Sequence, residues 1–499
     1  MNETLQKRFA SHRPEATLST IPLIALGLSG MLLGGCKSGP DFQAPREDMP
    51  VGWAGVATPT TSQPSATTTN VADIAQWWKT FNDPMLTRLV VDAVATNLDL
   101  QIAQIRVREA RASRGIAAGG LWPAASATAA YQRTRPAANV APNPAHDLFV
   151  AGLDAVWELD VFGGLRRNVE SAGATVLAAQ ESARDAQVSL VAEVALNYSQ
   201  LRGAQQQIII AQDNLKAQRH TADITRQRFT AGLVSGLDVA NADGQVATTE
   251  AQIPELETMV RQSIYALSVL LARPPASLVA ELSASEPVPV APGEVPVGLP
   301  SDLLRRRPDI RAAEARLHAA TAQIGVAVAD LFPKFSLTGS LTYHNNLLRD
   351  WFADSNRAFS FGPTVTWPLF QGGSIVSNIR LQHALRDESY LTYQKTVLVA
   401  LQDVENALIA FAKEQEHRES LSAAVTANKK AVDLSMQLYT QGQTDFLNVL
   451  NAQRSLYLAQ DALVQSQRAL ATHLIALYKA LGGGWQPEDR LASARPTGN

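Results

Sequence analysis

The strongest constraint on this chain is a long helical hairpin that occurs twice. Residues 164–272 read as a long helical run, a glycine turn and a second helical run, and residues 374–482 repeat this layout. Equivalent positions keep a constant shift of 210, so Gly232 in the first turn corresponds to Gly442 in the second. Two copies of one helical unit therefore dominate the predicted fold.

The helical prediction for the first run rests on periodicity. Its apolar or tolerant positions alternate in steps of three and four, which is the spacing of a coiled-coil seam. These positions are Val191, Val194, Tyr198, Leu201, Gln205, Ile208, Gln212 and Leu215. At 1.5 Å per residue a helix over 164–230 is roughly 100 Å long, whereas helices of globular proteins average ~10–14 residues. A fibrous coiled coil is one interpretation. The segments that join the hairpins show whether it is the right one.

The first residues resemble an export signal. A basic start precedes an apolar stretch over 18–33, and the small residues Gly34 and Gly35 end it. The stretch is shorter than the ~20 residues of a membrane-spanning helix. Cys36 follows as the only cysteine of the chain, so it cannot form an internal disulfide. The run Leu-Gly-Gly-Cys resembles the bacterial lipobox, which implies cleavage before Cys36, acylation of that residue and, because Lys37 follows, retention in the outer membrane. A chance cysteine at a signal boundary is the alternative.

The sequence period changes from helical to alternating twice in each repeat. Residues 124–135 are small and β-tolerant, and residues 148–161 place apolar side chains on one face and acids on the other. The second repeat has corresponding strands at about 334–344 and 358–370. Aromatic residues of the apolar faces are Trp157, Phe359, Phe361 and Trp367. This pattern is typical of tilted membrane-spanning strands of ~9–11 residues. For a single strand a soluble sandwich is the alternative, and the repeat favours the membrane.

The number of strands then constrains assembly. Two strands in each repeat make four in the chain, but no membrane barrel closes with fewer than about eight, since open edges cannot lie in lipid. Copies of the chain must therefore pool their strands, which predicts a cyclic oligomer. The long hairpins would leave such a barrel in one direction and line up as a tube of about 100 Å.

The chain divides into six expected segments. They are a lipoprotein signal peptide at 1–35, a lipidated extended leader at 36–72, repeat 1 at 73–273, a proline-rich linker at 274–300, repeat 2 at 301–484 and a C-terminal tail at 485–499. The helices expected within the repeats cover 84–119, 164–230 and 237–272 in the first, and 374–440 and 445–481 in the second. Pro254 falls inside one of them, so we expect a bend there.

Three sequence motifs resemble those of one family. They are Trp-Glu-Leu-Asp-Val-Phe-Gly at 157–163, Leu-Leu-Arg-Arg-Arg-Pro-Asp-Ile-Arg-Ala-Ala-Glu at 303–314 and Tyr-Lys-Ala-Leu-Gly-Gly-Gly-Trp at 478–485. In this order they resemble the lipoprotein branch of the TolC-like outer-membrane factors. The resemblance implies an α+β membrane protein with two tandem repeats, each a strand pair plus long coiled-coil hairpins. Three copies would form a twelve-stranded outer-membrane β-barrel that continues into a periplasmic α-helical tunnel.

The resemblance also implies a function and partners. The homotrimer would be the passive exit channel of a tripartite efflux pump for drugs or other small molecules. Its tunnel would meet a periplasmic membrane-fusion adaptor that serves a proton-driven inner-membrane pump, and the acylated Cys36 would lie in outer-membrane lipid. One alternative is the exit duct of a type I protein secretion system. A lipid-tethered periplasmic structural coiled coil is another, although it would have no reason to keep paired apolar strands.

In this family the adaptor docks on the helical turns at the tunnel tip, and a ring just beyond closes the tunnel. The matching docking residues are Phe229, Gly232, Leu233, Ser235, Leu237 and Asp238 in the first repeat and Tyr439, Gly442 and Thr444 in the second. The matching gate residues are Leu447, Asn448, Asn451 and Arg454. Family members often carry aspartates in this ring. Because Asn448 and Asn451 lack fixed charge, we expect closure by Leu447 and by hydrogen bonds of Asn451 and Arg454, without strong cation binding.

Composition and motifs argue against several other classes. A net charge of −3 with 18% charged residues provides no basic field for nucleic acid. The histidines show no ligand spacing and there is no second cysteine, so we expect no metal site. A phosphate-binding loop is absent from the sequence. The run 305–307 of three arginines before Pro308 reads as a helix boundary, solvated or paired with acids, in preference to a phosphate site. We therefore expect neither an enzyme nor a cofactor.

Overall fold

The computed structural model describes residues 37–54, 66–68, 74–135, 137, 145–290 and 294–485. The signal peptide, Cys36, most of the Thr/Ser/Pro tract at 58–69 and the tail beyond Trp485 lie outside these residues. The chain forms two compact units, which we call the sheet unit and the helical unit. The sheet unit comprises Met1–Phe42, Arg114–Ala172 and Ala320–Arg386, and the helical unit comprises Gln43–Ser113, Gly173–Ala319 and Asp387–Asn499. Among the described helices, none is both long and apolar enough to cross a membrane.

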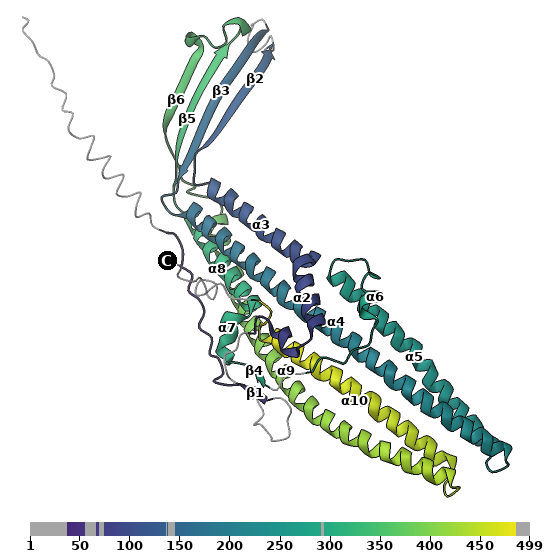
Figure 1. Ribbon diagram of the computed structural model, residues 1–499. Coiled ribbons are helices and arrows are strands. Elements are labelled where there is room, and N and C mark those ends of the chain that lie inside the picture. Colours follow the sequence, from purple (N-terminus) through teal and green to yellow (C-terminus); the bar gives the residue numbers. More distant parts are fainter. Residues whose placement is uncertain are drawn as a thin grey trace, which may run out of the picture. The chain divides into compact units, whose positions relative to one another are not determined.

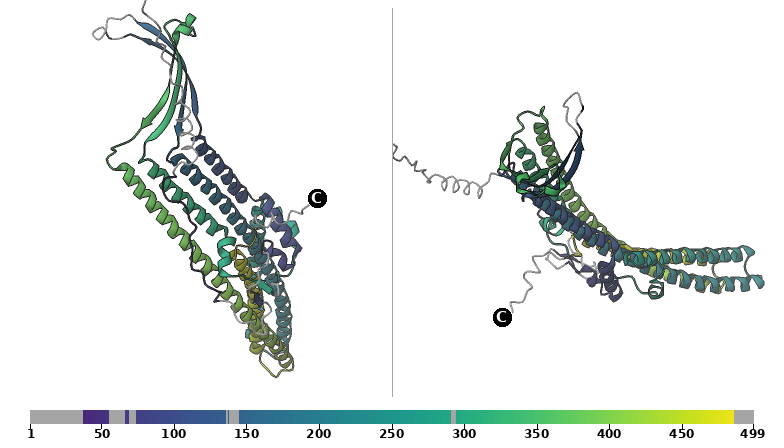
Figure 2. Two further views of the ribbon diagram at one scale, coloured as in Figure 1. Left: turned by 90° about the vertical axis from the view of Figure 1, so that its left-hand side faces the viewer. Right: turned by 90° about the horizontal axis from the view of Figure 1, so that it is seen from above.

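Two pairs of long helices carry the repeat (Figures 1 and 2). In the first pair α4 covers Gly164–Thr230 and α5 covers Gly236–Leu270. In the second pair α9 covers Ser374–Thr440 and α10 covers Phe446–Ala480. The two first helices have the same length of 67 residues, and the two second helices have the same length of 35. The ranges expected for these helices from the sequence are 164–230, 237–272, 374–440 and 445–481.

Glycine ends the two longest helices for the same reason. Gly232 has a φ of 73° and Gly442 a φ of 74°, in the left-handed region where a side chain is disfavoured. In both turns the amide after the glycine bonds back into the helix, from Leu233 N to Arg228 O at 2.8 Å and from Gln443 N to Leu438 O at 2.9 Å. These bonds satisfy carbonyls that the helix end leaves without partners.

The helix expected over 84–119 is two helices, α2 at Pro84–Thr96 and α3 at Leu98–Gly119. Asn97 separates them with an extended ψ of 132°. Its side-chain oxygen accepts a bond from Leu100 N at 2.9 Å, which caps the new helix, and its side-chain nitrogen donates to Leu270 O at 2.9 Å. The apolar period continues on both sides of Asn97, so the period did not reveal the break. At the start of α2 the Asp83 side chain accepts from Leu86 N, as a cap should.

Residues 274–300 are more ordered than a plain linker. They contain α6 at Val279–Leu282 and the short strand β4 at Glu294–Pro296, which pairs in parallel with β1 at Ala66–Thr68. The guanidinium of Arg202 on α4 is buried and donates to Ala284 O at 2.8 Å and to Glu286 Oε2 at 2.6 Å.

The remaining elements are α7 at Leu303–Arg306, α8 at Pro308–Ala329, and 3-10 helices at Trp77–Phe81, Pro300–Asp302, Leu348–Asp350 and Asp354–Asn356.

Four antiparallel strands form the sheet in the order β2, β3, β5, β6 (Figure 1). Their bounds are Ala124–Thr134, His146–Leu159, Lys334–Asn345 and Arg357–Thr366. The last strand is expected from the sequence to reach residue 370, but it ends at Thr366. Pro368 explains the early end, because proline has no amide to donate and restricts the residue before it.

The core of the helical unit confirms most of the predicted seam. Val191, Val194, Tyr198 and Leu201 of α4 are completely buried. Gln212 is exposed, so the prediction is wrong at that position. Ala211 and Leu215 on either side of it are buried, so the seam is interrupted at Gln212 and then continues. Pro254 lies within α5, and the bend expected there stays a prediction.

Candidate functional site

The register of the sheet places apolar and polar residues on opposite faces across all four strands. Ala127 pairs with Leu153, Leu153 with Leu341, and Leu341 with Phe359. The adjacent row is Ser126, Asp154, Ser340 and Ser360, in which the two serine hydroxyls lie 3.1 Å apart. Directly paired residues share one face of a sheet. One face is therefore a band of aliphatic and aromatic side chains, and the other is hydroxylic and acidic.

The aromatic residues predicted for the strands lie on the apolar face or at its end. Phe359 is 78% exposed and Phe361 is 80% exposed, so neither packs within a core of this chain. Trp157 Nε1 donates to Leu121 O at 3.0 Å, and Trp367 Nε1 donates to Leu331 O at 3.0 Å. These two bonds are related by the same shift of 210 positions as the helices, so the repeat holds in the side-chain contacts of the sheet unit.

The first turn of the helical unit presents a predominantly apolar surface. Phe229 is 50% exposed, Leu233 65% and Leu237 68%. Ser235 precedes α5, and the Asp238 side chain accepts from its amide at 3.1 Å, which satisfies a donor at the helix start. Gly232 has open space around the position of a missing Cβ. All six residues predicted for this turn therefore lie at one end of one hairpin.

The second turn differs from the first in burial. Tyr439, which the sequence analysis placed on the docking surface, is only 1% exposed and packs on Phe446 with ring centroids 5.7 Å apart. Thr444 accepts from the side-chain amide of Asn448 at 2.7 Å. Among the second-turn residues the ring of Tyr439 is thus a core group. The first hairpin of the same chain buries this ring. The sequence of the second turn alone does not reveal that packing.

An arginine that sequence reasoning did not select joins the two turns. Arg228 of α4 donates to Tyr439 O at 2.8 Å and to Thr440 O at 3.2 Å, which are the last carbonyls of α9. Its guanidinium also lies 4.7 Å from the centre of the Tyr439 ring. Cationic side chains are favourable at helix C-termini and over aromatic faces. The first hairpin therefore caps the second.

The predicted gate residues lie on one stretch of α10. Leu447 is 55% exposed, and Asn448, Asn451 and Arg454 are exposed as well. Gln453, between them, is buried instead, and its side-chain nitrogen donates to Thr221 Oγ1 of α4 at 2.8 Å. The exposed residues thus share the side of α10 that faces away from the first hairpin, as a lining residue requires.

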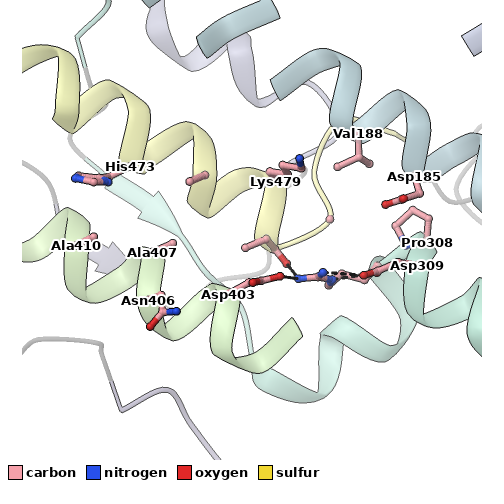
Figure 3. A pocket seen from close by; sticks show the side chains of 14 residues that line it. Asp185, Val188, Pro308, Asp309, Asp403, Asn406, Ala407, Ala410, His473 and Lys479 are labelled. Carbon is pink, nitrogen blue, oxygen red and sulfur yellow. Dashed lines mark hydrogen bonds and ion pairs between the residues drawn. The ribbon is translucent and has the colours of Figure 1, made fainter. Parts of the chain in front are cut away.

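A groove with a volume of 490 Å³ and several charged residues in its lining lies where α4, α8, α9 and α10 meet within the helical unit (Figure 3). Arg307 donates to Asp309 Oδ2 at 2.7 Å, to Asp403 Oδ2 at 3.1 Å and to Ala480 O at 3.1 Å. It directly precedes α8, so the predicted helix boundary with acid-paired arginine is what the structure has. The side chain connects the end of α10 to the start of α8.

Asp185 lines the same groove (Figure 3). Burial raises the pKa of its carboxyl group above the ordinary value, and the nearby charge of Asp309 raises it further, while Arg307 and Lys479 act in the opposite direction. In the part of the chain that the structure describes, no cluster of three or more histidine, cysteine, aspartate or glutamate residues could hold a metal ion.

Comparison with known proteins gives one consistent result. The model of the family described as outer membrane efflux protein matches residues 89–273 and again residues 299–483. Nodulation protein T of Rhizobium leguminosarum bv. trifolii is 33% identical over 458 residues, covering 92% of this chain and 96% of that protein. The antibiotic efflux pump outer membrane protein ArpC of Pseudomonas putida is 33% identical, covering 95% and 98%.

A solved structure supports the same assignment. The outer-membrane channel OprN is 36% identical to this chain, with a TM-score of 0.84, and the match covers 91% of this chain and 100% of that one. The two family matches coincide with the two helical repeats, and they include both strand pairs. The chain therefore belongs to the outer membrane efflux protein family, and it is an outer-membrane efflux channel and not an enzyme.

Proposed function

We propose that three copies of this chain form the passive exit channel of a tripartite efflux pump for drugs or other small molecules. The observation that carries the proposal is the sheet, which has an apolar band on one face and unpaired edges at β2 and β6. Open edges are not tolerated in lipid. Pairing of β6 with β2 of the next copy in a ring of three would remove every edge and produce twelve strands.

The proposal assigns the partners to separate regions of the chain. The exposed apolar turn at Phe229, Leu233 and Leu237 would dock a periplasmic membrane-fusion adaptor, which serves a proton-driven inner-membrane pump. Acyl chains on Cys36 would insert in the outer membrane, where each buried CH2 contributes about 0.8 kcal/mol. The exposed side of α10 with Leu447, Asn448, Asn451 and Arg454 would form the closed ring of the tunnel.

The names of the relatives support small molecules over a protein as cargo. One is named for antibiotic efflux, and others are named for toluene and solvent efflux. No observation on this chain favours the type I secretion duct or the structural coiled coil, and the exposed apolar face of the sheet argues against the latter.

Cross-linking and single-channel conductance test the proposal together. The purified protein should cross-link as trimers and pass small, mostly closed currents in planar bilayers. The double variant Leu447→Ala, Asn451→Ala should open for a much larger fraction of the time, because it removes the apolar and the amide contacts of the ring. Asn241→Ala is the matched control, since Asn241 occupies the position of Asn451 in the first repeat. Monomers that pass no current in any of these forms would overturn the channel proposal.

A further inference from the structure

The residues that directly follow Cys36, the proposed site of acylation, are built into the sheet unit. Residues 36–72 are expected from the sequence to form an extended leader. Ser38, however, is buried, and both its amide and its hydroxyl donate to the carbonyl of Phe162, at 3.0 Å and 2.6 Å. Phe162 lies in the connection between β3 and α4, and its ring stacks on Phe332 with centroids 4.5 Å apart. The described part of the leader thus begins at the end of the sheet where β3 leads into α4, which we call the base of the sheet.

Two glycines allow the leader to cross α8 in direct backbone contact. A Cβ on Gly39 would lie 2.5 Å from Gly325 Cα, and a Cβ on Gly325 would lie 2.6 Å from Ser38 O. Gly39 also has a φ of 77°, which favours glycine. Gly325 lies in the interior of α8, where glycine is a poor helix former. The close approach of the leader supplies a reason for that residue.

A buried arginine completes the contact. The side chain of Arg167 on α4 is 1% exposed, and three of its hydrogen bonds go to the leader. It donates to Ser38 O at 2.9 Å, to Gly39 O at 3.3 Å and to Asp41 Oδ1 at 2.8 Å. One further donor bonds to Glu170 Oε2 at 2.9 Å. A buried charge that loses its partners is strongly destabilising, so residues 38–41 of the leader are part of the fold of the sheet unit.

We propose that these contacts form a leader socket, made of residues 38–41 with Phe162, Arg167 and Gly325, that positions the lipid anchor. The inference rests on the proposed acylation of Cys36. Covalent geometry keeps the Cα of Cys36 within about 7 Å of the Cα of Ser38. The acyl chains therefore enter the membrane beside the base of β3, and the lipid acts as a fixed part of the sheet unit instead of a tether on a loose leader.

Protection of the bond between Lys37 and Ser38 tests the socket. Lys37 is exposed and Ser38 is buried, so trypsin can cut this bond only when the leader leaves the socket. Cleavage releases the lipid-bearing Cys36-Lys37 from the full-length mature protein, and intact-mass spectrometry measures its rate. We expect slow cleavage in the wild type and at least tenfold faster cleavage in Gly325→Ala, because the added methyl collides with the leader.

Gly115→Ala is the matched control. Gly115 also lies inside a helix of the sheet unit, in α3, and a Cβ there meets nothing within 4 Å. Alanine at this site should leave the cleavage rate unchanged. Ser38→Ala, which removes only the hydroxyl bond to Phe162, should speed cleavage about fivefold and serves as the test if Gly325→Ala does not accumulate.

The outcomes separate the socket from the acylation. Wild-type cleavage rates in both Gly325→Ala and Ser38→Ala would overturn the socket, whatever the mass of the released fragment. A wild-type fragment without acyl chains would overturn the acylation of Cys36 and with it the positioning of a lipid. Protection of the Lys37–Ser38 bond can still be measured in that case, so the two failures are distinguishable.

Discussion

The two hairpin turns of the helical unit share a backbone and differ in their side chains. Gly232 and Gly442 have the same left-handed conformation, and the bonds that close the two turns join equivalent positions. Phe229 is half exposed, but Tyr439 at the equivalent position is buried against the other hairpin. Arg228 reaches the end of α9, while its counterpart Leu438 is an exposed apolar residue. The two repeats thus share the backbone conformation of the turn, but their equivalent side chains differ in burial and in contacts.

This comparison indicates which turn offers a surface and which turn is held in place. The first turn exposes three large apolar side chains, whereas the second uses its aromatic residues as core. Contiguous exposed apolar groups rimmed by polar residues mark interaction sites. We therefore expect the first turn to contribute most of the contact with an adaptor and the second turn to depend on the first for its order. Substitutions in two equivalent pairs would break or sharpen this distinction, and a third pair tests a difference between the repeats in the groove.

The largest difference should separate Tyr439→Ala from Phe229→Ala. Truncation of the buried ring removes its packing and leaves a cavity, so the free energy of unfolding should fall by about 3 kcal/mol. Truncation of the exposed Phe229 should change that free energy by less than about 0.5 kcal/mol. Chemical denaturation of the two purified variants measures both. Equal losses in the two variants would contradict the division of the turns into surface and core.

Arg228→Ala should have the next largest effect. It removes two bonds from a charged donor to the end of α9 and the contact with the Tyr439 ring, together worth about 2 kcal/mol. The loss should be local, so amide hydrogen exchange should accelerate around residues 437–446 and remain unchanged in the sheet unit. Leu438→Ala at the equivalent position is the control and should not accelerate exchange at residues 227–236. Unchanged exchange in Arg228→Ala would show that the second turn is ordered without the first.

The smallest effect concerns the groove and depends on pH. The raised pKa of Asp185 means that ionisation of this carboxyl group costs the folded state stability. That cost is absent below the unfolded value of about 3.8 and complete above the raised folded value. Asp185→Asn should therefore raise the unfolding temperature slightly at about pH 7 and leave it unchanged at about pH 3.

Lys395 is the repeat equivalent of Asp185 and is exposed, so Lys395→Gln is the control and should give no comparable gain at pH 7. The measurement is thermal unfolding of the detergent-solubilised protein. If Asp185→Asn gained as much at pH 3 as at pH 7, its effect would come from packing and not from charge.

Much of the architecture could be predicted from local patterns. The bounds of α4 and α9 follow from apolar spacing and from the glycines that end them. Alternation predicted four strands with one apolar face, and the constant shift of 210 related the two halves. These features were accessible because periodicity, glycine and proline act on the backbone within a few residues. The break at Asn97 was missed, because a polar residue that caps a helix does not disturb the apolar period around it.

The sequence by itself determined the kind of protein: an exported chain, two repeats, long hairpins, and strands whose number requires copies to close a barrel. Only the tertiary structure decided which side chain of each equivalent pair is buried, that Arg228 caps the opposite hairpin, and that Arg167 and Gly325 receive residues from the leader. Such contacts join residues more than a hundred positions apart, as between Arg167 and Ser38. Burial and pairing at that range depend on the packing of whole elements, which no local pattern records.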